Sequence, residues 1–108
     1  MEEIILYSEE VEIFLNDLID ILFDNEYLGF REDAQDYAIK IVEFINQSIS
    51  TYPSKHTPPN LSQFGEKFML YKANNHTSWY IFFDQNEHKF LIKFITNNHT
   101  DFIQNFNL

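Results

Sequence analysis

Two runs of aromatic and β-branched residues, 78–84 and 88–102, constrain the fold of this chain more than any other feature. Turn-prone residues join them at 84–87, a pattern typical of two adjacent antiparallel strands. Successive residues of a strand point to opposite faces, and a strand with one wet face carries polar residues at every second position. The first run is instead apolar on both faces, with Trp79, Ile81 and Phe83 on one and Tyr80 and Phe82 on the other. We therefore expect both runs to be central strands.

The composition predicts one folded domain over residues 1–108. The chain is 44% hydrophobic and 18% aromatic, which is enough apolar surface to offset the entropy lost on folding. A chain of 108 residues is too short for two such domains. No apolar run approaches the roughly 20 residues of a membrane-spanning helix, and the acidic N-terminus is unlike a secretory signal. We expect a cytoplasmic protein without a membrane partner.

The charge of the chain is concentrated in its first third. Residues 1–36 hold 12 acidic residues and one basic residue, Arg31, for a net charge of −11, while residues 37–108 have a net charge of +1, giving −10 in total. Nucleic-acid binders present a basic face to phosphate groups, and this face supplies most of their affinity. Direct binding to nucleic acid is therefore disfavoured, although a local basic patch could form on the sheet from Lys67, Lys72, Lys89 and Lys93.

The first half of the chain predicts one strand and a pair of helices. Residues 3–7 form a short strand, and Ser8 has the side chain of a helix N-cap, with Glu9 and Glu10 complementing the positive end of the helix. Apolar residues with helical spacing then predict helices to about Asp24 and from about Arg31. The first stripe comprises Val11, Phe14, Leu15, Leu18 and Leu22, and the second Ala34, Tyr37, Ala38, Ile41, Val42, Ile45 and Ile49.

The second half predicts a connector followed by three strands. Residues 51–63 contain all three prolines, so we expect neither a helix nor a paired strand there. Strands are expected at 67–72, from Trp79 and from Phe90 to about Ile95, followed by a turn and a short helix with Phe102, Ile103 and Phe106 inward. The predicted fold class is α+β, in the order β-α-α-β-β-β. Its four-stranded, mainly antiparallel sheet should carry the helical hairpin on one face.

This order, with the proline-bearing connector and a last strand that runs into a histidine-containing turn, resembles the RelE/ParE superfamily of small bacterial toxins from toxin–antitoxin pairs. The residue-level similarity is confined to residues 79–102, where His99 stands at the place of the family's His-Arg-x-x-Tyr element. At that place this chain reads His99-Thr100-Asp101-Phe102, so the arginine and the terminal tyrosine hydroxyl of the element are missing. The strand matching Trp79 to Phe83 also lacks the arginine that is common there.

The resemblance implies three candidate catalytic residues if the chain cleaves RNA: His99, Tyr80 and Lys93. Such cleavage needs a base, an acid for the leaving oxygen and fixed cations. Phe102 transfers no proton, and a histidine in an asparagine-rich turn is more often a capping residue than a catalyst. We therefore rank RNA cleavage below a ParE-like mode, in which the protein binds and inhibits a protein target such as a topoisomerase.

We expect neither a metal nor a cofactor. The chain has no cysteine, and His56, His76 and His88 lie in separate loops without the spacing of a metal site. The aromatic face with Tyr80 and Phe82 is either core or an exposed partner-binding surface. Three hypotheses remain: a toxin held off by a cognate antitoxin, a non-toxic interaction module of the same fold, and a weak mRNA endonuclease.

The expected partner is an antitoxin that brings lysine and arginine to the acidic helices. Its apolar anchors would fill the groove between the helices or cover exposed aromatic positions of the sheet. A dimer formed by two copies of this chain is a further alternative. The residues expected to bind the partner are Glu9, Glu10, Glu12, Asp17, Trp79 and Phe102.

Overall fold

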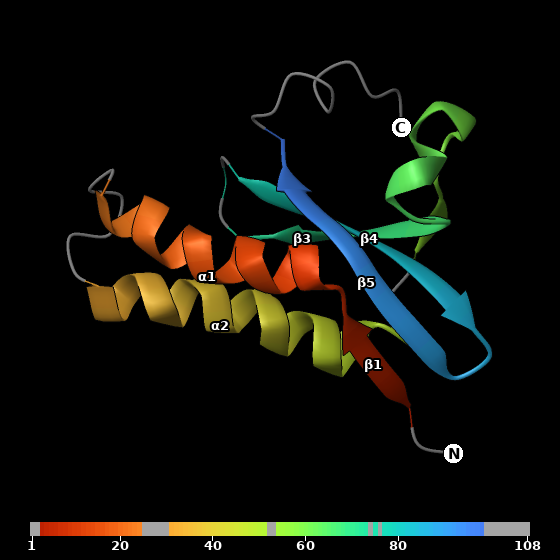
Figure 1. The fold of residues 1–108 in the computed structure, drawn as a ribbon, viewed down its shortest axis with the longest axis horizontal. Coiled ribbons are helices and arrows are strands. Elements are labelled where there is room, and N and C mark those ends of the chain that lie inside the picture. Colours follow the sequence, from red (N-terminus) through yellow and green to blue (C-terminus); the bar gives the residue numbers. More distant parts are fainter. Residues whose placement is uncertain (1–2, 25–30, 52–53, 74, 76, 99–108) are drawn as a thin grey trace.

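The structure is a computed structural model that describes residues 3–24, 31–51, 54–73, 75 and 77–98. Figure 1 shows two helices packed beside a twisted sheet, with a short 3-10 helix on the far side of the sheet. The elements in chain order are β1 (Ile4–Tyr7), α1 (Glu9–Asp24), α2 (Arg31–Ser48), β2 (Lys55–His56), the 3-10 helix η1 (Pro59–Phe64), β3 (Lys67–Lys72), β4 (Ser78–Asn86) and β5 (Lys89–Asn97).

The described strands form one five-stranded sheet in the order β1-β5-β4-β3-β2. β1 lies parallel to β5, and the other neighbouring pairs are antiparallel. The mixed α+β class and the mainly antiparallel sheet are thus confirmed, with the strands β3, β4 and β5 consecutive as expected. The expected number of four strands was wrong, because β2 adds a fifth at the edge beside β3.

The proline-bearing connector is more ordered than its composition suggests. β2 lies between Pro53 and Pro58, so both of its backbone N–H groups remain available, and Thr57 continues the pairing by donating its N–H to the Glu66 carbonyl over 2.9 Å. Pro59 begins η1, where a missing N–H costs nothing because the first turn of a helix has no internal acceptor for it. The prediction of neither helix nor paired strand here was wrong.

The turn between β4 and β5 is tighter than the sequence suggests. β4 continues to Asn86 and β5 begins at Lys89, so only Glu87 and His88 connect them, with Glu87 in the left-handed region at φ 57°. Asp84 was expected in the turn but belongs to the strand, where its carboxylate accepts the Glu66 N–H over 2.8 Å. β5 also runs two residues beyond Ile95, the end we expected.

The start of α1 matches the expectation. The Ser8 hydroxyl accepts a hydrogen bond from the Val11 N–H over 3.2 Å, which satisfies one of the free donors of the first helical turn. Three glutamates lie in that first turn, where they complement the positive helix end. Of the apolar stripes, the side chains of Leu22 and Ala34 lie outside the described part of the chain.

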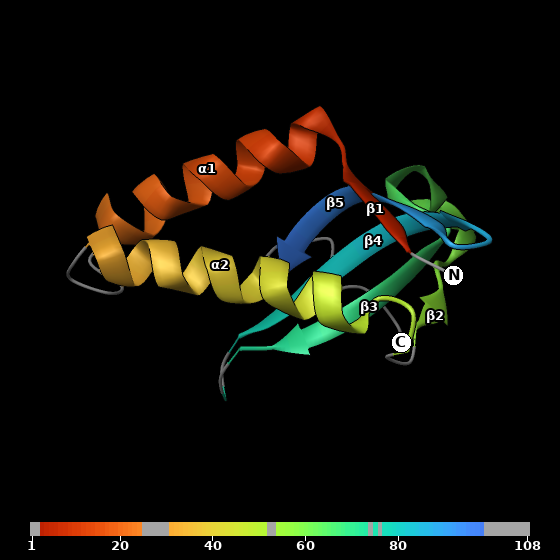
Figure 2. The ribbon, with the colours of Figure 1, turned by 90° about the horizontal axis from the view of Figure 1, so that it is seen from below.

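The core has two layers, one on each face of the sheet. The helices cover one face (Figure 2), where Leu18 and Ile41 pack against Ile81 and Phe83 of β4. The other face carries what we call the outer aromatic cluster: Phe64, Phe68, Leu70, Tyr80, Phe82 and Phe94. β4 is buried on both faces at the centre of the sheet, so the prediction of a central strand is confirmed.

Candidate protein-binding groove between the helices

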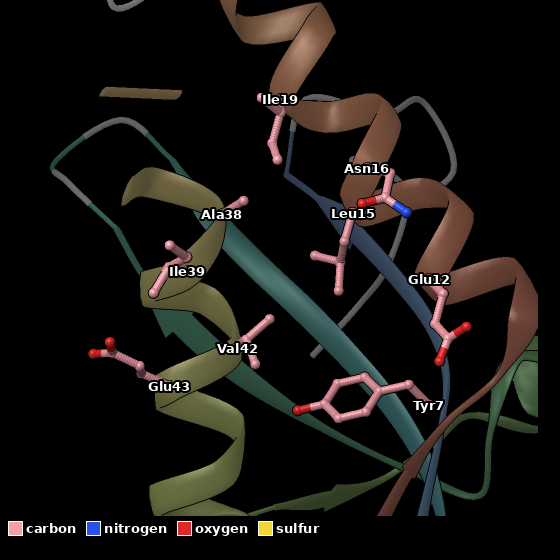
Figure 3. A pocket seen from close by; sticks show the side chains of 9 residues that line it. All are labelled: Tyr7, Glu12, Leu15, Asn16, Ile19, Ala38, Ile39, Val42 and Glu43. Atoms are coloured by element: carbon pink, nitrogen blue, oxygen red, sulfur yellow. The ribbon is translucent and has the colours of Figure 1, made fainter. Parts of the chain in front are cut away.

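A groove of about 440 Å³ lies between α1 and α2 (Figure 3). We call it the helix groove. Figure 2 shows the two helices separating toward the start of α1, and the side chain of Tyr7 from β1 extends between them at that end. Its apolar walls are formed by Leu15 and Ile19 of α1 and by Ala38, Ile39 and Val42 of α2; Glu12, Asn16 and Glu43 add polar groups.

Tyr7 closes one end of the helix groove. Its hydroxyl donates a hydrogen bond to the Asn46 amide oxygen of α2 over 2.6 Å, which ties β1 to the second helix. Burial raises the pKa of Tyr7 from 10.0 to about 12, so the phenol keeps its proton and remains a hydrogen-bond donor even near pH 10, where a free tyrosine ionises. Ser50, just beyond α2, hydrogen-bonds the carboxylate of Glu3 in the same region. Polar contacts therefore connect β1 to α2 and its C-terminal end at this end of the groove.

The surroundings of the helix groove are acidic. Glu12 and Glu43 line it, and Glu9, Glu10 and Asp17 are exposed on α1. Among the described residues, none of these five carboxylates forms an ion pair. Because unpaired carboxylates of one sign create a field that attracts cations, the groove combines an apolar interior with a negative potential at its mouth. Such a combination is complementary to an apolar segment that carries positive charge.

Ile39 shows how accessible the apolar surface of the groove is. Its side chain is 50% exposed although it lines the groove, and Ile13 on the outer side of α1 is exposed to a similar degree, 53%, outside the groove. Burial of such side chains in a complex releases apolar surface from water at about 25 cal/mol per Å². Burial of Ile39 in a complex would therefore contribute binding energy, and Ile13 provides a matched reference site outside the groove.

The expected partner-binding residues differ in exposure: some lie on the surface and Trp79 is buried. The four acidic residues of α1 lie on the surface, and Glu12 borders the groove. Trp79 is only 3% exposed; its ring Nε1–H donates to the Tyr37 hydroxyl over 3.0 Å, and it meets the Phe14 ring edge-on. The expectation of a partner surface at Trp79 does not fit this position, because the helices cover its face of the sheet. Phe102 lies outside the described residues.

The expected catalytic residues are not assembled in the described part of the chain. Tyr80 is 8% exposed in the outer aromatic cluster, and burial raises its pKa, which disfavours a proton-accepting phenolate. Lys93 occupies a β-bulge between the Phe82–Phe94 and Phe83–Ile92 pairs. Its Nζ lies 3.3 Å from Asp84, whereas Tyr80 pairs with Thr96, three residues further along β5. His99 lies outside the described residues.

In the outer aromatic cluster Phe68, Tyr80 and Phe82 are buried as core, whereas Phe64, Leu70 and Phe94 are half-buried around them. Phe64 of η1 stacks on Phe94 with ring centroids 4.6 Å apart, and Phe82 lies beneath them fully buried. Of the two alternatives for the face that carries Tyr80 and Phe82, the core is therefore the one observed. No group of three histidine, cysteine or acidic side chains able to hold a metal occurs among the described residues.

Sequence reasoning placed a binding groove between the helices but missed most of the residues that line it. Tyr7 was assigned only to a strand, and Ile39 interrupts the polar side of α2 next to Lys40. Ala38 and Val42 of the α2 wall belong to the predicted apolar stripe, and an isoleucine outside that stripe is the signal that could have added Ile39 to them. Tyr7 lines the groove only because β1 ends close to α2. The sequence near Tyr7 does not predict this position.

Comparison with protein families, with curated proteins and with solved structures gave no match to this chain. No helix among the described residues has the length and apolar character needed to cross a membrane. The functional interpretation therefore rests on the geometry and charge of the helix groove.

Proposed function

We propose that this protein is the toxin-like component of a bacterial toxin–antitoxin pair, which acts by binding another protein and is neutralised by a cognate antitoxin. The observation that carries the binding part is the apolar helix groove of about 440 Å³ with its acidic rim, whose carboxylates have no ion-pair partner within the described part of the chain. The toxin part rests on the resemblance to the RelE/ParE superfamily. Its basis is the element order β1, α1, α2, β3, β4 and β5, into which the short β2 is inserted.

The antitoxin segment that fits the helix groove is a basic amphipathic helix. A helix presents apolar anchors at positions i, i+3 or i+4 and i+7, and these anchors can enter a groove between two helices. Lysine and arginine at its flanks would meet Glu12, Glu43 and the acids of α1. Complementary charges mainly speed encounter and reject wrong partners, while the buried anchors supply most of the affinity.

The environments of Lys93 and Tyr80, the two catalytic candidates within the described residues, favour protein binding over RNA cleavage. Lys93 is occupied by Asp84, and Tyr80 is buried with a raised pKa, so neither presents a free base or cation to a ribose phosphate. The non-toxic interaction module of the same fold remains the second candidate, because the same groove would serve it equally well. Growth arrest on expression distinguishes the toxin from the non-toxic module.

The first experiment is induced expression with and without the neighbouring gene. We expect growth arrest from this chain alone and relief when a neighbouring small protein is co-expressed. Normal growth under strong expression would favour the non-toxic module. Fragmentation of cellular mRNA during arrest, abolished by His99→Ala, would favour the endonuclease.

The second experiment tests the groove itself with a matched pair of variants. Ile39→Lys places a charge in the groove wall, and Ile13→Lys makes the same change at an equally exposed site outside it. We expect Ile39→Lys to weaken binding of the neighbouring gene's product at least about 100-fold, as for loss of a buried anchor, and Ile13→Lys to leave it nearly unchanged. Equal effects of the two variants would reject the groove as the binding site.

Salt dependence tests the acidic rim. Stopped-flow measurements should show that the association rate falls steeply as salt rises, because screening weakens attraction between opposite charges. Neutral replacement of Glu9, Glu10, Glu12 and Asp17 should remove most of that dependence. An association rate independent of ionic strength would reject the acidic helices as the docking face.

A further inference from the structure

The strand β1 lies at one edge of the described sheet, beside β5 (Figure 1). Its Ile4 N–H donates to the His88 carbonyl, and the Ser8 N–H donates to the Ile92 carbonyl, each over 3.0 Å. Even-numbered residues of this segment therefore direct their N–H groups toward β5. Since backbone groups alternate along a strand, the N–H groups of Ile5 and Tyr7 point away from the sheet.

The side chains beside this edge are apolar and exposed. Ile4, Leu6 and Leu91 are 41%, 57% and 37% exposed, and Leu6 pairs in register with Leu91. We call these three residues the edge strip. They lie on the face of the sheet opposite the helices, because Ile5 and Tyr7, which alternate with them along β1, pack against the helix-side core. A hollow of about 370 Å³ adjoins the strip, lined by Leu6, Leu91 and the polar ends of β4 and β5.

An exposed edge with alternating apolar side chains is the arrangement that accepts an added strand. Main-chain hydrogen bonds then supply affinity, and pockets for every second side chain supply specificity. Soluble proteins usually protect such an edge with charge, proline or a cover. β1 contains neither proline nor a charged residue between Ile4 and Tyr7, so its own sequence offers no such protection.

We propose that β1 and the edge strip bind an extended segment of a partner protein, which adds to the sheet as a further strand and carries lysine or arginine between alternating apolar residues. The charge of the chain argues for a basic occupant. Glu3 precedes β1, and three glutamates follow it in the first turn of α1. Lys89, in register with Ile4, is the cation that faces the strip, while Lys93 is already paired with Asp84.

A second copy of this chain is a poorer occupant than a basic partner. Each copy has a net charge of −10, and joining two copies through β1 would bring their acidic first thirds together. Like charges at close range cost binding energy and penalise such a pairing. The docking edge meets the helix groove at Tyr7, whose N–H belongs to the edge while its side chain lines the groove. The edge strip itself does not line the groove, so binding at the strip is possible whether or not a helix occupies the groove.

The test uses a synthetic peptide, Lys-Val-Arg-Val-Lys-Val-Arg, labelled with fluorescein and titrated with the whole chain at low salt. A control peptide has proline in place of the second and third valines, which removes backbone donors at constant charge. We expect the first peptide to bind measurably below about 1 mM, the proline peptide to bind at least about tenfold more weakly, and Leu6→Ser to weaken binding about tenfold. Ile13→Ser, at an equally exposed apolar site elsewhere, should bind as the wild type does.

Amide hydrogen exchange provides a readout of the backbone that does not depend on a variant. The N–H groups of Ile5 and Tyr7 should exchange at least about tenfold more slowly when the peptide is bound, because they become hydrogen-bonded. Absence of binding up to about 1 mM peptide, or binding unaffected by both proline and Leu6→Ser, would overturn the proposal. So would a dimer seen by sedimentation that Leu6→Ser dissociates, because the second copy would then be the occupant.

Discussion

Replacing Gly65 with alanine tests how the outer aromatic cluster is closed. Gly65 follows η1 and precedes β3, with φ 155° and ψ 157°. Only glycine populates this backbone region readily, and another residue there costs about 1–3 kcal/mol. The conformation lets the chain turn from η1 into β3 while the ring of Phe64 stays stacked on Phe94. A side chain at position 65 therefore strains the backbone at the point where η1 is attached to the sheet.

The added methyl group would also collide with the central strand. A Cβ at position 65 would lie 2.7 Å from the backbone nitrogen of Phe83 and 3.1 Å from the carbonyl carbon and Cβ of Phe82. Neighbouring backbone cannot rotate out of the way as a flexible side chain could. Overpacking of this kind typically costs a further 1–3 kcal/mol or so. We expect Gly65→Ala to lower the free energy of unfolding by about 2–6 kcal/mol, a large part of the stability of a typical domain.

Urea denaturation followed by circular dichroism measures this loss. For a slope of about 2 kcal/mol per molar urea, in the middle of the usual range, the unfolding midpoint should fall by about 1–3 M. Gln63→Ala is the control, because Gln63 is exposed in η1 and its replacement adds no strain. A midpoint for Gly65→Ala within about 0.3 M of the control would refute the reasoning. It would mean that η1 can shift away from the sheet at little cost.

Three further predictions concern the core, pH and nucleic acid. Leu18→Ala and Ile41→Ala should each destabilise the protein by about 2–5 kcal/mol, because both side chains are buried between helix and sheet; unchanged urea midpoints would contradict their core positions. Burial raises the pKa of Tyr7 to about 12 from 10.0, so its contribution is complete below pH 10 and is lost as pH rises toward 12. Thermal unfolding should therefore show the advantage of the wild type over Tyr7→Phe shrinking across that range, and a constant difference would argue against the shift. The purified protein should bind RNA and DNA weakly at physiological salt and leave naked RNA intact; salt-sensitive binding below about 1 μM in a filter-binding assay would contradict this.

Local patterns predicted the helices and the long strands. The cap at Ser8 and the apolar stripes gave α1 and α2, and an aromatic run that is apolar on both faces gave the central position of β4. Prediction failed where pairing over a distance overrides local preference. β2 exists because β3 supplies hydrogen-bond partners to Lys55 and His56, and the turn moved to Glu87 because pairing with β5 extends β4 to Asn86.

The candidate site shows the same division. The sequence indicated acidic helices and a groove between them, because charge and helical periodicity are local properties. It did not predict that Trp79 is buried, since both faces of an apolar strand look alike until the helices cover one of them. Nor did it predict that Ile39 and Tyr7 line the same groove, because residues 32 positions apart meet only when β1 and α2 pack together.

The sequence by itself determined the α+β class, the two amphipathic helices, the central aromatic strands and the acidic first third. Each follows from the spacing of residue types along a short stretch, which sets local backbone preference and the side that must be buried. Only the tertiary structure decided that β1 joins β5 in parallel at the edge, that η1 covers the second face, and that the helices separate around Tyr7. These features depend on long-range contacts, whose energies compete across the whole chain and leave no trace in any local pattern.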